Sequence, residues 1–372
     1  MAYWRIVVIL ALGAGPLLHA QSARLRPAQP ISLPAPIVDG NSPAFWGQAV
    51  LRVFTSSGLQ MAMRGPNLFS LVNYTPPVID APGHYPPLWI EGVWRDNDGT
   101  VYAWYHHEAD GGCAYRGLMT PMIGALVSHD GGETFHDLGI ILSSGSTANC
   151  LAANGYFAGG HGDFSVILDR RRRYFYFLFT NYGGPESEQG VAMARMAFAD
   201  RTHPAGAVYK YYGGQWKEPG IGGRVTPVLP AAVSWDRLNT DSFWGPAVHW
   251  NTHLRRYVIL LNRACCKTQW PQEGIYVTFT PDLSNPASWK EPVKIPYSQE
   301  LDFSPGYYPQ AFGTRVGESD SLVGEVGRFF IQGISKWEIV FSRQPDPQPW
   351  FGLMAEAPPE FDAVLPELWP DE

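Results

Sequence analysis

The chain has 372 residues, 45% of them hydrophobic, which is enough for one large domain with a sizeable core. Charged residues make up only 16%, while glycine (39), proline (33) and aromatic residues (14%) are abundant, a balance that favours short strands and turns. The net charge of −7 offers no basic field to phosphate backbones, so nucleic acid is not an expected partner.

The first 20 residues have the pattern of a signal peptide. Arg5 supplies a positive charge, an apolar stretch follows, and Leu18-His19-Ala20 resembles a signal-peptidase site. We expect residues 1–20 to be removed and the protein to be secreted or periplasmic. No later segment offers about 18 consecutive apolar residues, so no integral membrane span is expected after removal.

Residues 21–36 are rich in proline and predict an extended linker. From residue 37 to 372 we expect a single domain, because one unit of strand, polar turn and stronger strand recurs along it. The five predicted hairpins are 42–46 with 50–55, 89–94 with 101–106, 162–168 with 174–180, 244–250 with 257–262, and 308–312 with 328–333. This repetition predicts an all-β fold, a five-bladed β-propeller of four-stranded antiparallel blades.

Two polar segments are interpreted as turns. Residues 128–135, Ser-His-Asp-Gly-Gly-Glu-Thr-Phe, match the Asp-box of sialidase-like propellers, in which Asp130 and Ser128 would satisfy turn amides. Asp130 is therefore not a catalytic candidate. The run Arg170 to Arg173 lies between two apolar stretches and favours a solvated hairpin turn over a binding patch.

The four cysteines are an even number, which suits disulfides in an exported protein. Cys113 and Cys150 are the best candidates for one bridge. Cys265 and Cys266 are adjacent, so they either form a vicinal bond or pair elsewhere. No cysteine or histidine spacing fits zinc, so we expect no metal and no cofactor.

Acidic residues stand at the starts of the first three predicted inner strands: Asp39, Glu91 and Asp163. Inner-strand starts and second-strand ends reach the same mouth of a propeller channel, where ligands bind. Convergent carboxylates can protonate a glycosidic oxygen and activate water or attack the anomeric carbon. Each one alone fits a turn-capping role equally well, but three at equivalent positions favour catalysis.

Aromatic and polar groups near these positions are the expected substrate-binding residues, since rings stack on sugar faces and polar groups bind hydroxyls. They are Trp46, His106, His107, His161, Asn181, Trp244, His249, Arg263, Tyr308 and Gln310. For His106 and His107, a role as hydrogen-bonded wall residues is favoured over direct ligand contact.

The blade pattern, the order of these acids, and the phrases Trp244-Gly245-Pro246-Ala247 and Tyr308-Pro309-Gln310 resemble five-bladed glycoside hydrolases of the arabinanase, β-xylosidase, invertase and levansucrase type. Mapped by blade, the resemblance implies Asp39 as base or nucleophile, Glu91 as a modulating carboxyl and Asp163 as the acid. The chain departs from those families in having Glu on blade two and Asp on blade three.

The leading hypothesis is a secreted, monomeric glycoside hydrolase with a poly- or oligosaccharide substrate. A non-catalytic carbohydrate-binding propeller is the first alternative, because the same mouth would bind sugars without competent carboxylate spacing. A protein-interaction propeller is the second, although it would favour an apolar rim.

Overall fold

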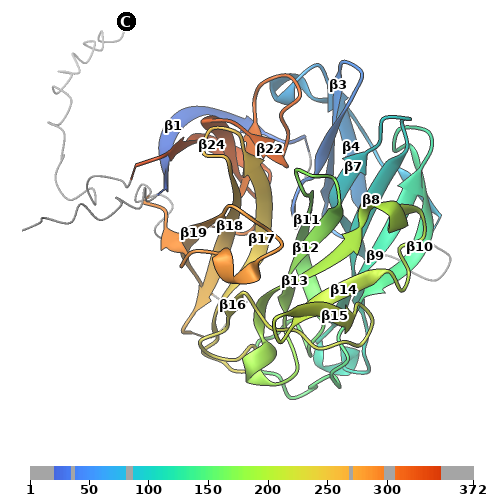
Figure 1. Ribbon diagram of the computed structural model, residues 1–372, viewed down its shortest axis with the longest axis vertical. Coiled ribbons are helices and arrows are strands. Elements are labelled where there is room, and N and C mark those ends of the chain that lie inside the picture. The colour runs from blue at the N-terminus through green and yellow to red at the C-terminus, as the bar shows by residue number, and fades with distance from the viewer. Residues whose placement is uncertain (1–20, 35–37, 81–86, 268–270, 297–305, 345–372) are drawn as a thin grey trace, which may run out of the picture.

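The computed structural model describes residues 21–34, 38–80, 87–267, 271–296 and 306–344. The expected signal peptide lies outside these ranges. Their strands form five separate sheets arranged as the blades of a propeller (Figure 1), which confirms the predicted fold. In the part of the chain so described, no helix has the length and apolar character needed to cross a membrane.

Each blade has an antiparallel core of four strands, numbered here from the channel outwards. The inner strands contact one another around the axis. From blade one to blade five they are β2 (Ala44–Gly47), β7 (Leu88–Arg95), β11 (His161–Leu168), β17 (Asp241–Asn251) and β21 (Gln310–Gly313). The second strands are β3 (Val50–Ser56), β8 (Val101–Ala109), β12 (Tyr174–Asn181), β18 (Arg256–Cys265) and β23 (Val326–Ile331). All five predicted hairpins are therefore present.

The outer halves complete the blades. The third strands are β4 (Gln60–Gly65), β9 (Thr120–Ser128), β13 (Gly190–Ala197), β19 (Gln272–Thr280) and β24 (Ile334–Ser342). The fourth are β5 (Val72–Thr75), β10 (Thr134–Leu142), β14 (Val208–Tyr212), β20 (Val293–Lys294) and β1 (Ser22–Ser32). Additional short strands are β6 (Val78–Asp80), β15 (Gln215–Pro219), β16 (Leu229–Pro230) and β22 (Leu322–Val323). The 3-10 turns are η1 (Leu68–Ser70), η2 (Ala114–Arg116), η3 (Glu186–Glu188), η4 (Phe198–Thr202) and η5 (Pro286–Ser288).

The ring of blades is closed by the segment that was expected to be a linker. Strand β1 pairs antiparallel with β24 and is the outermost strand of the fifth blade (Figure 1). Its prolines suggested an unpaired chain, but an edge strand tolerates proline, and the register shifts between Pro27 and Ile31. The first and last described strands therefore belong to one blade, and the linker expected over 21–36 is corrected.

Aromatic side chains fill the spaces between blades. Phe175, Phe177 and Phe179 alternate along β12 and are fully buried, as expected for one face of a strand. The ring of Trp104, from β8 of the second blade, lies 5.0 Å from the ring of Phe175 and 5.7 Å from that of Phe177. This packing fixes the second and third blades relative to each other, and with them the two inner strands that carry acids.

Bulges in the inner strands position the acids. The pairing of β7 with β8 shifts between Ile90 and Gly92, which leaves Glu91 unpaired. The pairing of β11 with β12 shifts between Gly162 and Phe164, which leaves Asp163 unpaired. A bulge locally re-aims a side chain, and here it occurs at matching positions of adjacent blades.

The polar segment from Ser128 to Phe135 forms a turn held by its own side chains. The Asp130 carboxylate accepts the backbone N–H groups of Glu133 and Thr134 at 3.0 and 2.9 Å, and the Ser128 hydroxyl accepts that of Gly132. Because these contacts are internal to the turn, Asp130 has a structural role, as expected.

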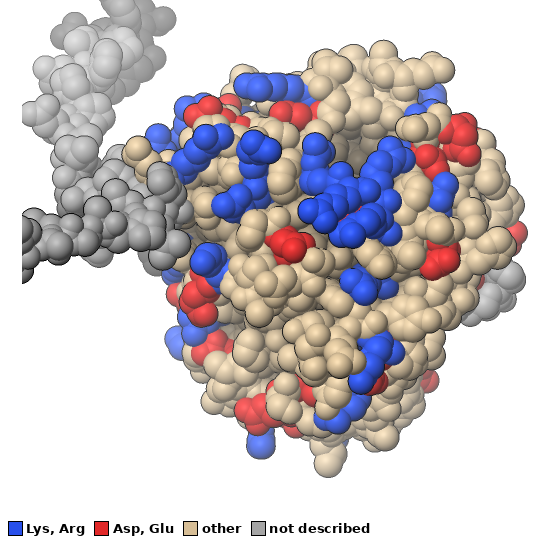
Figure 2. All heavy atoms as spheres, in the orientation of Figure 1, with Lys and Arg blue, Asp and Glu red and all other residues tan. Residues whose placement is uncertain are grey.

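The arginine run from Arg170 to Arg173 is the exposed turn between β11 and β12. The Arg170 and Arg172 guanidinium groups lie over the rings of Trp250 and Trp94, at 5.4 and 5.5 Å from their centroids. Figure 2 shows basic side chains gathered on one face, with acidic ones scattered around them. The turn is thus solvated and stacked on aromatic rings, as expected.

The expected Cys113–Cys150 bridge is present, and of the two alternatives for Cys265 and Cys266 the structure has the vicinal bond. The first bond ties the loop that follows β8 to the loop that precedes β11. It therefore joins two loops next to the inner strand that carries Asp163.

Candidate active site

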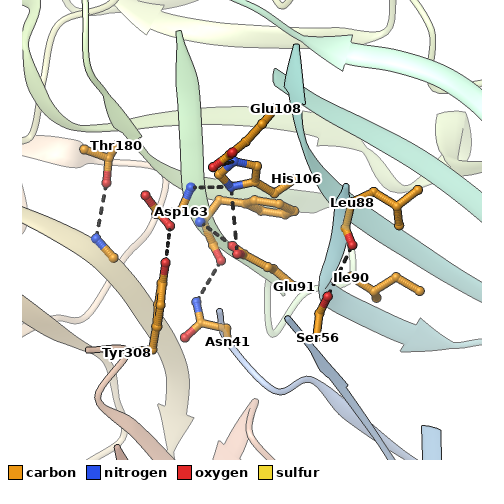
Figure 3. A network of polar contacts seen from close by, with 12 residues as sticks. Asn41, Ser56, Leu88, Ile90, Glu91, His106, Glu108, Asp163, Thr180 and Tyr308 are labelled. Atoms are coloured by element: carbon orange, nitrogen blue, oxygen red, sulfur yellow. Dashed lines mark hydrogen bonds and ion pairs between the residues drawn. The ribbon is translucent and has the colours of Figure 1, made fainter. Parts of the chain in front are cut away.

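Asp163 is the centre of the polar network drawn in Figure 3. Its backbone has a φ of +42°, in the left-handed region, and its side chain is buried. The Tyr308 hydroxyl donates to Oδ1 at 2.9 Å, and the Tyr182 hydroxyl donates to Oδ2. Burial raises the pKa of Asp163, while these two phenol donors act in the opposite direction because they stabilise the ionised form.

Glu91 is enclosed behind Asp163. Only 2% of its side chain is exposed, and its Oε2 accepts the backbone N–H of Phe164 at 2.7 Å. Gly40 lies against Oε1 so closely that a Cβ there would be 3.0 Å from the oxygen. Burial, followed by the charge of Asp163, raises the pKa of Glu91 well above its usual value. Glu91 therefore keeps its proton to a higher pH than an exposed glutamate does.

His106 lies between the acids. Its Nδ1 accepts the backbone N–H of Asp163 at 3.1 Å, so the proton of the neutral ring is on Nε2. Nε2 points to Glu108, whose Oε1 is 3.7 Å away (Figure 3). Burial lowers the pKa of His106 to about 3, so the imidazole stays neutral.

Glu108 and Asp39 are the more accessible acids of the mouth. The Glu108 side chain is 24% exposed, and burial followed by the charges of Asp163 and Asp39 raises its pKa to about 7. Asp39 is exposed at the residue level. Its carboxyl group is nevertheless partly buried, and this burial, followed by the charge of Asp163, raises its pKa to about 6.

Blade one positions Asp39 through the backbone around it. The Asp39 N–H donates to Ser56 O at 2.7 Å, which joins it to the end of β3. Two residues on, the Asn41 amide donates to Phe164 O and Pro246 O, at 2.8 and 3.1 Å. Asn41 therefore links blade one to blades three and four across the channel.

An aromatic wall surrounds the acids. It comprises Phe157, Tyr182, Trp235, Trp244, Tyr307 and Tyr308, which form one cluster. The Tyr182 ring lies 4.4 Å from that of Phe157 and 5.0 Å from that of Trp235, and this packing fixes the phenol that faces Asp163. Of the predicted binding residues, Trp244 and Tyr308 belong to this wall.

Three other predicted binding residues lie at the same end of the blades but have structural partners. The His107 ring is 3.2 Å from Pro87 O, and the Asn181 amide donates to Gly183 O and Glu188 O. Arg263 forms a two-point ion pair with Asp241, at 2.8 and 2.9 Å.

His161 is buried at the start of β11. Together with Asn181 it lines a second hollow of about 210 Å³, whose wall also includes Glu188 and Arg224. This hollow is therefore separate from the group formed by Asp39, Asp163 and Glu108.

The structure corrects the expected positions of Trp46 and His249. Trp46 is next to the turn between β2 and β3, the end opposite to Asp39, and its Nε1 donates to Glu318 O at 2.6 Å. His249 lies far along β17 and packs against the Phe341 ring. Gln310 is a structural link, because its amide exchanges two hydrogen bonds with the Ser42 backbone. Trp46 and His249 are too far along their strands to contact a ligand in the mouth. The Gln310 amide is already used in hydrogen bonds to the backbone.

Glu91, His106 and Asp163 have the composition of a metal-binding group, with one potential ligand atom of each within 4.8 Å of the others. However, His106 Nδ1 already accepts the Asp163 N–H, and each Asp163 oxygen already accepts one phenol hydrogen bond. The geometry therefore fits an internal hydrogen-bond network better than a cation site.

Sequence reasoning missed Glu108 and Asn41. Glu108 follows His106 and His107 in β8, which extends to Ala109 rather than ending at His106. The signal was present, since an acid two residues after an inward-facing histidine lies on the same side of a strand. For Asn41 no signal in the sequence distinguishes a channel link from an ordinary turn residue.

Comparison with solved structures supports the fold. The chain resembles the endo-arabinase from Bacteroides thetaiotaomicron VPI-5482, with a TM-score of 0.53 and 12% identity over 84% of this chain and 96% of that one. It also resembles the α-L-arabinofuranosidase from Lactobacillus brevis, with a TM-score of 0.51 and 11% identity over 83% of this chain and 92% of that one. No protein-family model and no curated protein sequence matches the chain.

Proposed function

We propose that the protein is a secreted glycoside hydrolase whose substrate is a poly- or oligosaccharide bound at the channel mouth. The observation that carries the proposal is that four carboxyl groups lie close together: Asp39, Glu91, Asp163 and Glu108. The charge of Asp163 raises the pKa of each of the other three. Acid and base roles become possible where neighbouring carboxyl groups ionise at different pH.

Asp39 is the group best suited to activate water or attack the anomeric carbon. It is exposed, so it can touch a sugar, and a pKa of about 6 leaves it mostly ionised at pH 7. Among the described residues of the first blade, no other acid takes part in the network around Asp163. This is the role that the resemblance to five-bladed glycoside hydrolases implies for Asp39.

Asp163 and Glu91 act from behind the reacting groups. Asp163 receives two phenol hydrogen bonds, which suit a carboxylate that stabilises positive charge developing at the anomeric carbon. Glu91 is too enclosed to touch a sugar, so it takes the place of the modulating carboxyl next to Asp163.

The surroundings of the acids fit a carbohydrate ligand and an oxidising compartment. In the aromatic wall, Tyr307 and Tyr308 are only partly buried, and their rings can contact a sugar. The two disulfides suit an exported protein, in agreement with the signal peptide expected at residues 1–20.

The experiment is a substrate screen on the mature chain, with release of reducing sugar as the readout. Arabinan and aryl α-L-arabinofuranosides come first, because the two solved enzymes named above are described as acting on arabinose-containing linkages. Galactosides, xylosides and fructans complete the panel. Turnover of any of them supports the proposal, and failure on the whole panel contradicts it.

A carbohydrate-binding propeller without catalysis is the second candidate. The observation that favours it is the engagement of both Asp163 oxygens by phenols, since this removes one carboxyl group from direct contact with substrate. Binding of an oligosaccharide by calorimetry, with no product after prolonged incubation, would select this candidate.

A further inference from the structure

We propose that Glu108, and not Asp163, is the proton donor of this reaction, and that His106 positions its carboxyl group. The inference rests on the proposed function and adds a residue that the resemblance to known hydrolases does not assign. It starts from the unused N–H of a buried imidazole: among the described residues, His106 Nε2 has no hydrogen-bond partner and faces Glu108.

The four acids differ in whether a bound sugar could contact them. A general acid must come within hydrogen-bond distance of the glycosidic oxygen. The Glu91 side chain is 2% exposed and Asp163 is 3% exposed at the residue level, whereas the Glu108 side chain is 24% exposed. With Asp39 assigned to water or the anomeric carbon, Glu108 is the remaining acid of this group that a sugar can touch.

Hydrogen bonding points the same way. Both Asp163 oxygens already accept a hydrogen bond from a phenol, and these two contacts stabilise the ionised form of Asp163 and so oppose its protonation. Glu108 accepts no phenol hydrogen bond within the described network around Asp163. It is surrounded by Asp39, Glu91 and Asp163, and the neutral His106 is the group on its own strand that faces it.

The charges around Glu108 favour a retained proton. Partial burial and the carboxylates of Asp163 and Asp39 bring its pKa to about 7, close to the operating range of a general acid. His106 does not reverse this effect, because it stays neutral. The 3.7 Å from Nε2 to Oε1 is slightly beyond a hydrogen bond, and such catalytic contacts commonly tighten when substrate binds.

The bond between the anomeric carbon and the glycosidic oxygen breaks, and its electron pair stays on the oxygen, which takes the proton of Glu108 and leaves as an alcohol. The new Glu108 carboxylate accepts the N–H of His106. Asp39 takes one proton from the water that adds to the anomeric carbon. Asp39 then releases this proton to solvent and Glu108 takes one up from solvent, which restores the starting state.

The test compares two leaving groups with Glu108→Gln. An alkyl or sugar leaving group needs the proton, whereas 2,4-dinitrophenolate departs without it. We expect at least about a hundredfold loss of kcat/KM on the oligosaccharide, the lower range for acid–base groups, a much smaller loss on the dinitrophenyl glycoside, and loss of the fall in rate above pH 7. Glu338→Gln, whose side chain is 30% exposed on the fifth blade, is the matched control.

Equal losses on both substrates, or an unchanged pH profile, would overturn the inference. If Glu108→Gln does not fold, Glu108→Asp, which keeps the acid but withdraws it, must show the same difference between leaving groups. A wild type without activity on any glycoside contradicts the proposed function itself, so the two failures are distinguishable.

Discussion

The Tyr308 hydroxyl donates a hydrogen bond of 2.9 Å to Oδ1 of Asp163 and so joins the fifth blade to the third across the channel mouth. Both residues have left-handed backbone, with φ of +57° and +42°. Such conformations persist only where the surrounding structure imposes them. Here the Tyr308 N–H is bonded to Asn262 and the Asp163 N–H to His106. The contact is therefore held at both ends.

Tyr308→Phe tests what this contact does for Asp163. The lost phenol donor stabilises the ionised form of Asp163 in the wild type. We expect the pKa of Asp163 to rise and the acid limb of the pH–rate profile to move to higher pH. Tyr307→Phe, at the neighbouring wall residue, should leave the limb in place. A profile that does not move in Tyr308→Phe would contradict the role of an ionised Asp163.

Glu91→Gln tests the enclosed acid through stability. A carboxyl group whose pKa is raised on folding binds its proton more tightly in the folded state. Its contribution to stability is therefore full below pH 4.5, the value in the unfolded chain, and is lost as pH rises through the folded pKa. Glu91→Gln has no such proton, so its melting temperature should fall less than that of the wild type as the pH rises above 4.5. Parallel curves of melting temperature against pH would contradict a raised pKa of Glu91.

The disulfides give a prediction that is independent of catalysis. Titration of the denatured, unreduced protein should find no free thiol. The double variant Cys113→Ser, Cys150→Ser should unfold with a free energy lower by about 2 to 4 kcal/mol, as is typical for loss of a native bridge. Four titratable thiols, or an unchanged denaturation midpoint, would refute the assignment.

The hairpins and the convergence of Asp39, Glu91 and Asp163 could be predicted from sequence because they depend on local patterns. Apolar alternation and turn residues define each inner hairpin, and equivalent positions in repeated units share one face. Strand β1 could not be predicted in this way. Its prolines suggest an unpaired chain, and the strand with which it pairs, β24, is far away in the sequence.

The details of the site depend on tertiary contacts. Glu108 acquires its role from the bulge at Asp163, which turns a backbone N–H towards His106 Nδ1 and so leaves Nε2 facing Glu108. The sequence predicts Trp46 at the channel mouth, together with the other binding residues. Strand β2 has only four residues, however, and its third residue, Trp46, is already next to the turn at the opposite end. Blade membership was thus predictable, whereas depth along the channel was not.

The central claim is that the Asp39 carboxylate takes part in hydrolysis, and the most direct measurement is the rate of Asp39→Asn beside the wild type. The substitution keeps the size of the side chain and removes the charge that is present above pH 6. On the best substrate of the screen at pH 7, we expect an unchanged melting temperature and a turnover at least about a hundredfold lower, the lower range for acid–base groups. An active wild type with an equally active, folded Asp39→Asn variant would contradict the account.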